Sequence, residues 1–231
     1  MVKSSGKLLS ADVYEAIRSD VLAGRREPGA RIKIAAVADQ CGVSLSVVRE
    51  ALTRLAEQGL LINEPNHGFC VIPLSPTDLT DLTHVRIHIE GLAIHQAIER
   101  GDITWEASVI GAHHVLECTP LTSPQDHHRV LETWATAHTA FHHSLIQGCN
   151  SPRLIEIAQS LRDAAELYRR WSVSFAPGDP RDINAEHRAI LDAVVNRQPD
   201  TAQHLLTHHI QQTTDLLLAA LAAGLRTSSS P

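Results

Sequence analysis

The stretch AHTAFHHSLIQ (residues 137–147) contains histidines at a spacing that suits metal binding. His138 and His142 are four residues apart, which on a helix places both imidazole rings on one face, where they can share a metal ion. His143 points about 100° away from its neighbour on a helix, so we expect it to lie off such a site. The alternative is that these are core histidines bonded to backbone or water.

Spacing alone does not select this pair, because His84/His88 and His204/His208 are also four residues apart. Both of those pairs share a helix face with polar residues, which indicates solvent or a subunit contact. The first pair differs because it belongs to a stripe that should face the interior of a helical bundle, made of Leu131, Ala135, His138, His142 and Leu145.

Two more histidines are expected to face inward by the same test. His187 lies three and four residues before Ile190 and Leu191, and His209 lies four residues after Leu205. Buried histidines need partners, and four inward rings from three helices can find one together in a divalent cation. The predicted metal ligands are therefore His138, His142, His187 and His209.

The residues around these histidines predict a bundle of helices separated by glycine and proline. Six helical segments are expected, at about 76–100, 103–118, 124–147, 151–173, 180–197 and 199–224. We expect a linker at 74–76, an all-helical domain at 77–225 that binds an effector and dimerises, and a disordered tail at 226–231.

The first 73 residues predict a different arrangement. Apolar periodicity indicates helices at Leu8–Ala23, Ile34–Cys41 and Leu45–Gln58, with Ser44 as the N-cap of the last one. Two extended runs follow, joined by the turn PNHG (65–68). This order is that of a winged helix-turn-helix, in which the second helix of the pair fits the DNA major groove. A small helical domain with no nucleic-acid role is the alternative that periodicity leaves open.

Composition supports two regions of different chemistry in a mostly α protein. The chain carries a net charge of −6 and is 43% hydrophobic. The first 73 residues hold nine basic and eight acidic residues, whereas the rest hold 11 basic and 18 acidic ones. Because the first region is not strongly basic, charge alone would not reveal nucleic-acid binding.

Cysteine usage and the absence of targeting patterns predict a cytoplasmic protein. The cysteines form no CxxC pair, so we expect reduced packing thiols at Cys41, Cys70, Cys118 and Cys149. No apolar run approaches the ~20 residues that span a bilayer, and the N-terminus has no signal-peptide core. We therefore expect no membrane partner.

Longer segments resemble known families. CGVSLSVVREALTRLAEQGLL (41–61), preceded by EPGARI, resembles the DNA-binding domain of the GntR family of bacterial transcription regulators. RIHIEGLAIHQAIERG (86–101), AFHHSLIQGCNSPRL (140–154) and AEHRAILDAVVNRQPDTA (185–202) resemble the FCD effector-binding domain of its FadR subfamily. The resemblance implies a DNA-binding repressor that acts as a homodimer on double-stranded operator DNA.

The first resemblance implies a set of DNA contacts, with phosphate and base recognition by hydroxyl and guanidinium groups. The implied residues are Arg31, Lys33, Ser44, Ser46, Arg49, His67 and Gly68. Two positions depart from the family, because many members carry arginine where this chain has Leu45 and Ala35. A surface ion pair with Glu50 or Glu57 is the alternative role for Arg49.

The second resemblance implies a metal and an effector. Many FCD domains bind a metal through an aspartate and three histidines, and His138 stands where the aspartate usually is. Four imidazoles suit a divalent transition metal, zinc or nickel above all, and a more positive centre favours an anionic ligand. The resemblance implies a small organic acid as effector, held in part by Arg86. A simple ion pair with Glu90 is the alternative, and Arg162 and Arg169 are weaker candidates.

Three functions follow from these features. The leading one is a transcription regulator, not an enzyme, controlled by a small carboxylate in a metal-containing helical domain. The second is a metal-responsive regulator. The third is a metal-dependent hydrolase or oxygenase fused to a DNA-binding domain, although no HExxH, GxSxG or P-loop pattern is present.

Overall fold

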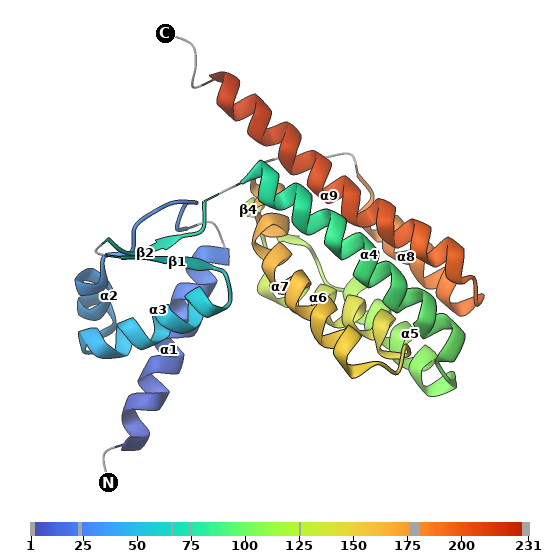
Figure 1. Cartoon of the computed structure of the whole chain (residues 1–231), viewed down its shortest axis with the longest axis horizontal. Helices are drawn as coiled ribbons and strands as arrows, with labels where there is room; N and C mark the ends of the chain where they lie inside the picture. Colours follow the sequence, from blue (N-terminus) through green and yellow to red (C-terminus); the bar gives the residue numbers. More distant parts are fainter. Residues whose placement is uncertain are drawn as a thin grey trace. The chain divides into compact units, whose positions relative to one another are not determined.

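The computed structural model divides into two compact units, Met1–Ser75 and Pro76–Pro231, and Figure 1 shows the elements of each. It describes residues 3–22, 25–65, 67–73, 75–124, 126–175 and 181–227. The helix end expected at Ala23 and Gly24, Leu74 of the linker, the break at residues 177–180 and the tail from residue 228 onward lie outside the described residues.

The first unit contains three helices and an antiparallel hairpin. The helices are α1 (Lys3–Leu22), α2 (Ile34–Cys41) and α3 (Leu45–Glu57), and the strands are β1 (Leu61–Glu64) and β2 (Gly68–Val71). The second helix has its predicted bounds, whereas α1 begins before the predicted Leu8. The elements follow the order expected of a helix-turn-helix with a hairpin behind it.

Apolar periodicity explains the packing of the first unit. Val13 and Ile17 of α1 and Leu52 and Leu55 of α3 are all buried, and α1 packs against α3. The hairpin pairs Leu61 with Val71 through Glu64 with Gly68. Gly68 has φ +79, a backbone conformation that favours glycine and that closes this turn.

The second unit is a helical bundle, and the mostly α fold class is confirmed. Its helices are α4 (Pro76–Arg100), α5 (Ile103–Glu117), α6 (Glu132–Gln147), α7 (Pro152–Phe175), α8 (Ile183–Val195) and α9 (Pro199–Thr227). Figure 1 shows α9 running alongside α4, where the Oγ1 atoms of Thr83 and Thr214 lie 2.7 Å apart. The last helix continues past Leu225, into the segment expected to be a disordered tail.

The prediction of a helix at 124–147 is wrong for the residues before Glu132, where α6 begins. Strand β3 (Thr122–Ser123) pairs with β4 (Asp126–Val130) around Pro124, so the unit is not purely helical. Leu131 is extended, with ψ 139, and its backbone N–H donates to the carbonyl of Leu121. Because Val130 is buried in this extended form, tertiary packing outweighs the local helical preference.

The cysteines are all free, as expected, but only two of them pack in the interior. Cys70 and Cys149 are buried, whereas Cys41 and Cys118 are exposed, so the expectation of four packing thiols is wrong for the latter pair. Among the helices of the described ranges, none is both long and apolar enough to cross a membrane.

Candidate metal centre and nucleic-acid interface

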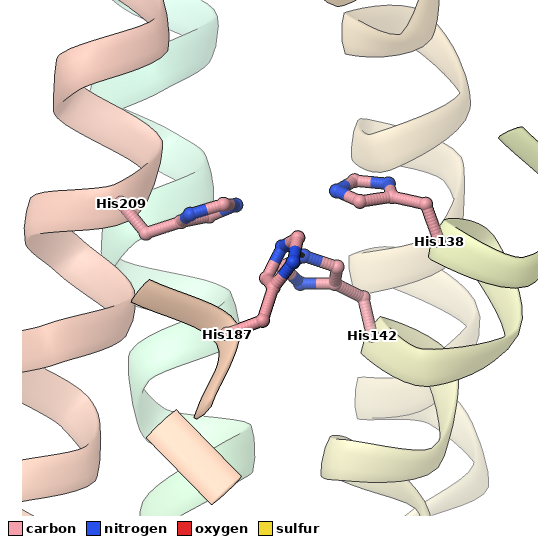
Figure 2. Close-up of side chains that lie close together, drawn as sticks. All are labelled: His138, His142, His187 and His209. Carbon is pink, nitrogen blue, oxygen red and sulfur yellow. Dashed lines mark hydrogen bonds between the residues drawn. The ribbon is translucent and has the colours of Figure 1, made fainter. Parts of the chain in front are cut away.

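Four histidine rings from three helices meet inside the second unit (Figure 2). His138 and His142 come from α6, His187 from α8 and His209 from α9, and none of these residues exposes more than 6% of its surface. One ring nitrogen from each lies within 4.8 Å of the others. The structure thus brings together the four residues that helix periodicity placed inward, and their role as ligands stays a prediction.

The spread of these nitrogens fits a metal ion after a small adjustment. Nitrogens at ~2.1 Å from one cation lie at most about 4.2 Å apart, slightly closer than here. The Nε2 atoms of His142 and His187 are already 3.3 Å apart. The Nδ1 atoms of these two rings are buried and have no hydrogen-bond partner among the described residues. The close approach of the two Nε2 atoms is what fits a shared cation, whereas the Nδ1 atoms would stay unpaired beside a metal bound at Nε2.

Electrostatics keep the four imidazoles neutral, which is the form that binds metal. Burial is the main cause that lowers the pKa of each ring, and it lowers the pKa of His187 to about 2. Positive charge adds to this effect, because Arg169 lowers the pKa of His138 and Arg162 lowers that of His142. The site is thus a buried set of neutral nitrogen donors in a positive field.

Glu186 and Arg181 orient the ring of His209. The Nδ1 atom of His209 lies 2.8 Å from a Glu186 carboxylate oxygen and 3.2 Å from the Arg181 guanidinium. Because the shorter contact needs a proton on Nδ1, we assign this tautomer, which leaves Nε2 with the free lone pair. Burial raises the pKa of Glu186, but hydrogen bonds from Arg181 and His209 outweigh it and lower that pKa to about 2. The carboxylate thus stays charged and holds the ring in place.

Replacing Glu186 with glutamine is expected to weaken metal binding about 10- to 100-fold, because an amide fixes neither the tautomer nor the ring orientation of His209. Competition against a chromophoric chelator measures this affinity. Glu117→Gln, at an ion pair with Arg188 on the surface, serves as the matched control. Equal metal affinity in the two variants would contradict the orienting role.

A stack of side chains supports His138 on its other side. The Trp134 ring lies 4.6 Å from the His138 ring at an interplanar angle of 21°, and the Arg169 guanidinium lies 5.1 Å from the Trp134 ring. Arg169 also donates two hydrogen bonds to Glu166. Packing on a rigid indole restricts the rotation of the His138 ring and thereby positions it for a ligand.

A second charged cluster joins α4 to α7. Glu90 has no exposed surface and accepts hydrogen bonds from Arg86 at 2.8 Å and from Arg162 at 3.1 Å. The ion pair that was the alternative role for Arg86 is therefore present. One carboxylate cannot neutralise two guanidinium groups, so the cluster keeps a net positive charge. Arg162 raises the positive potential at His142, which links this cluster to the histidines.

The remaining histidine pairs lie on the surface, as expected from their polar neighbours. His84, His88, His204 and His208 are exposed. His143 is half-buried and pairs with the Gln147 amide at 2.8 Å, away from the four rings. His113 of α5 is a further buried histidine, and its ring meets Phe141 edge to face at 5.3 Å. It does not belong to the group of four.

The predicted DNA-contacting residues occupy two places in the first unit. Ser44, Ser46 and Arg49 are exposed at the start of α3. The N-cap prediction for Ser44 is wrong in one respect, because its hydroxyl bonds to the Ser46 hydroxyl at 2.8 Å and makes no capping bond. Arg49 has no ion pair among the described residues, so the expected alternative with Glu50 or Glu57 is not formed.

Arg31, Lys33, His67 and Gly68 belong to the loop and hairpin beside these helices. The Arg31 guanidinium donates to the His67 carbonyl at 3.3 Å and contacts Glu64 at 3.4 Å. The Arg31 backbone also forms a β-bridge with Cys70 of β2. Lys33 is the exposed N-cap residue of α2. The contacts of Arg31 place its guanidinium at the turn of the hairpin.

Sequence reasoning missed the residues that support the histidines, namely Trp134, Arg181 and Glu186. Trp134 lies four residues before His138 on α6, so helix spacing could have signalled this contact. Glu186 of α8 and Arg181, just before that helix, meet His209 of α9, and helix spacing carries no signal for such contacts. Glu186 offered one weak signal, because it precedes the inward-facing His187. Arg162 was only a weak candidate, and its bond to Glu90 shows that it belongs to the charged cluster.

Two family profiles match most of the chain. The profile of the bacterial regulatory proteins of the gntR family matches residues 9–71, and that of the FCD domain matches residues 81–212. The chain is 31% identical over 198 residues to the HTH-type transcriptional regulator BphR of Paraburkholderia xenovorans, which covers 86% of this chain and 80% of that protein. It is 26% identical over 222 residues to the HTH-type transcriptional repressor GlaR of Escherichia coli, covering 94% and 99%.

Solved structures show the same fold. E. coli McbR/YncC aligns with a TM-score of 0.69 at 21% identity, covering 91% of this chain and 97% of that one. A putative transcriptional regulator GntR from Rhodococcus sp. RHA1 aligns with a TM-score of 0.70 at 24% identity, covering 91% and 98%.

Proposed function

The chain belongs to the gntR family of bacterial regulatory proteins and carries an FCD domain, and from this premise we propose a repressor controlled by a small carboxylate at a metal centre. Like its relatives, it is a DNA-binding transcription regulator, and it is not an enzyme. The name of GlaR as a repressor supports repression as the mode of action. The observation that carries the metal-dependent part is the meeting of four buried histidines.

The proposed metal is zinc or nickel. The donors are four neutral imidazole nitrogens, a set that suits a transition metal better than magnesium or calcium. With neutral ligands, a divalent ion keeps its full charge in a buried site where Arg162 and Arg169 already make the potential positive. An anion at an open coordination position would lower this charge, which supports a carboxylate as effector.

Arg86 is the proposed second contact for the effector. Its guanidinium is partly buried and shares Glu90 with Arg162, so the cluster has positive charge to spare for an anion. A carboxylate that bridges the metal and this cluster would connect α4 and α7 with the helices that carry the histidines. Such a bridge gives the effector different interactions in two arrangements of the bundle, as an allosteric ligand requires.

We propose that two copies of the chain bind a near-palindromic operator as a homodimer. One helix-turn-helix reads one half-site, and two-fold symmetry of the protein matches that of the operator. In each copy α3 would enter the major groove, with Arg49 on a base or phosphate and with Ser44 and Ser46 on phosphates. Arg31, Lys33, His67 and Gly68 would follow the adjacent backbone.

Metal removal tests the proposal against its main alternative. An operator is first selected in vitro from random DNA with the full-length protein. After dialysis against a chelator, we expect operator affinity to stay within about twofold, whereas any response to acetate, lactate or succinate present before dialysis disappears. Gel-shift titrations with and without added zinc or nickel measure both quantities. Restoration of the response by metal completes the test.

A metal-responsive regulator is the second candidate, because ligands from α6, α8 and α9 let metal binding alone tie three helices together. In that case chelation alone, without any acid, would change operator binding: it would abolish binding if the metal promotes it and restore binding if the metal prevents it. A response to acids that survives complete removal of metal would contradict both candidates.

Arg49→Ala is expected to weaken operator binding by about 1–3 kcal/mol, because an exposed, unpaired guanidinium at this position can form a fork on guanine. Gel-shift titration at fixed salt concentration measures the change. Arg153→Ala, which removes an exposed arginine from the second unit, should leave the affinity unchanged. Equal affinities of the wild-type protein and the Arg49 variant would refute the contact.

A further inference from the structure

An apolar side chain stands at the start of α3, where polar residues are expected to meet DNA. Leu45 is the first residue of this helix and has 51% of its surface exposed. Burial along the helix begins one turn later, at Val48. Leu45 therefore lies half exposed, ahead of the buried positions of α3.

The neighbours of Leu45 are groups that suit the edges and backbone of DNA. Ser44 and Ser46 flank it with exposed hydroxyls that bond to each other at 2.8 Å. Arg49 follows four residues later on the same side of the helix, exposed and without an ion pair in the described ranges. An isolated exposed leucine needs no explanation in general. Its place between two hydroxyls and one turn before an unpaired guanidinium is what singles it out.

The major groove offers one apolar group to such a side chain. Residues near the N-terminus of a recognition helix contact base edges, and the methyl group at C5 of thymine is the apolar feature of those edges. A methylated cytosine carries the same group at the same position. We propose that Leu45 contacts a pyrimidine 5-methyl group in each half-site and that this contact selects the base there. A basic residue at this position would instead favour guanine.

This inference rests on the proposed placement of α3 in the major groove, and removal of single methyl groups from DNA tests it separately. The probe is an operator duplex selected in vitro from random DNA with the full-length protein. Each thymine is replaced in turn by deoxyuridine, which deletes only the methyl group. Each cytosine is replaced in turn by 5-methylcytosine, which adds one. Fluorescence anisotropy at fixed salt gives the affinity of the wild-type protein and of Leu45→Ala for every duplex.

For the wild-type protein, we expect one thymine position in each half-site, related by the two-fold symmetry, to be sensitive to deoxyuridine. Each single replacement there should weaken binding about fourfold, the effect of one buried methyl group. If that position holds cytosine, 5-methylcytosine should strengthen binding to a similar degree. Leu45→Ala should bind the methylated and unmethylated duplexes equally. Leu45→Met, which keeps an apolar side chain of similar length, should retain most of the discrimination.

Leu92→Ala is the matched control, since Leu92 is a comparably exposed leucine on α4, with 47% of its surface accessible. It should keep the full ratio of affinities for thymine and deoxyuridine duplexes. The inference is overturned if no methyl group distinguishes the wild-type protein from Leu45→Ala while Arg49→Ala still loses affinity. If Arg49→Ala and the methyl scan are both without effect, the groove placement itself fails.

Discussion

His142→Ala is expected to remove most of the bound metal and to lower the melting temperature. His142 has 2% of its surface exposed, and its Nε2 atom lies 3.3 Å from that of His187, so both rings face the same centre. Metal that binds only the folded state adds about 3–4 kcal/mol to the free energy of unfolding when its concentration exceeds the dissociation constant 100- to 1,000-fold. Elemental analysis of protein purified without a His-tag measures the metal, and thermal unfolding measures the stability.

Loss of a buried ring also leaves a cavity, so the stability change must be separated from simple packing loss. Chelation should lower the melting temperature of the wild-type protein but not that of His142→Ala, because the variant has little metal to lose. His204→Ala removes an exposed histidine of α9 and should keep both metal and stability. Equal loss of metal from the two variants would show that the four buried rings are not the site.

A change of the metal ligand at position 138 distinguishes metal binding from effector binding. His138→Asp should retain the metal, since aspartate also binds transition metals. Its negative charge should weaken an anionic effector, because the centre becomes one unit less positive. A carboxylate response that is as strong in His138→Asp as in the wild-type protein would argue against direct contact between the effector and the metal.

Glu90→Gln is expected to lower the free energy of unfolding by about 3–5 kcal/mol, the cost of breaking a buried ion pair by removing one partner. Glu90 is fully buried, and its carboxylate is hydrogen-bonded to both Arg86 and Arg162. Glutamine has nearly the same shape but no charge, so two partly buried guanidinium groups would lose the carboxylate that binds them both. Urea denaturation monitored by circular dichroism measures the change.

A second substitution identifies the cause of this instability. Arg86→Met added to Glu90→Gln should recover part of the loss, because it removes one of the two uncompensated cations. Glu117→Gln breaks the more exposed pair with Arg188 and should cost at most about 1 kcal/mol. A loss for Glu90→Gln as small as that of this control would mean that the two guanidinium groups find other partners or water.

Helix periodicity determined a large part of what is observed. The apolar stripes of α1, α3 and α6 place their side chains against a core, since residues three and four apart share a helix face. The same rule placed His138 and His142 inward with Leu145, and placed His204 and His208 outward. Glycine and proline marked most helix ends because these residues disrupt helical backbone geometry or its hydrogen bonds.

Only the tertiary structure decided the features that depend on contacts between elements far apart in the chain. The hairpin before α6 forms because Thr122 and Val130 pair across a turn and Val130 is buried there, which local preference does not reveal. Glu186 of α8 contacts His209 of α9, and Glu90 joins α4 to α7. Side-chain types and helix faces follow from the sequence by short-range geometry, whereas the partner that a buried charge meets depends on how whole helices pack.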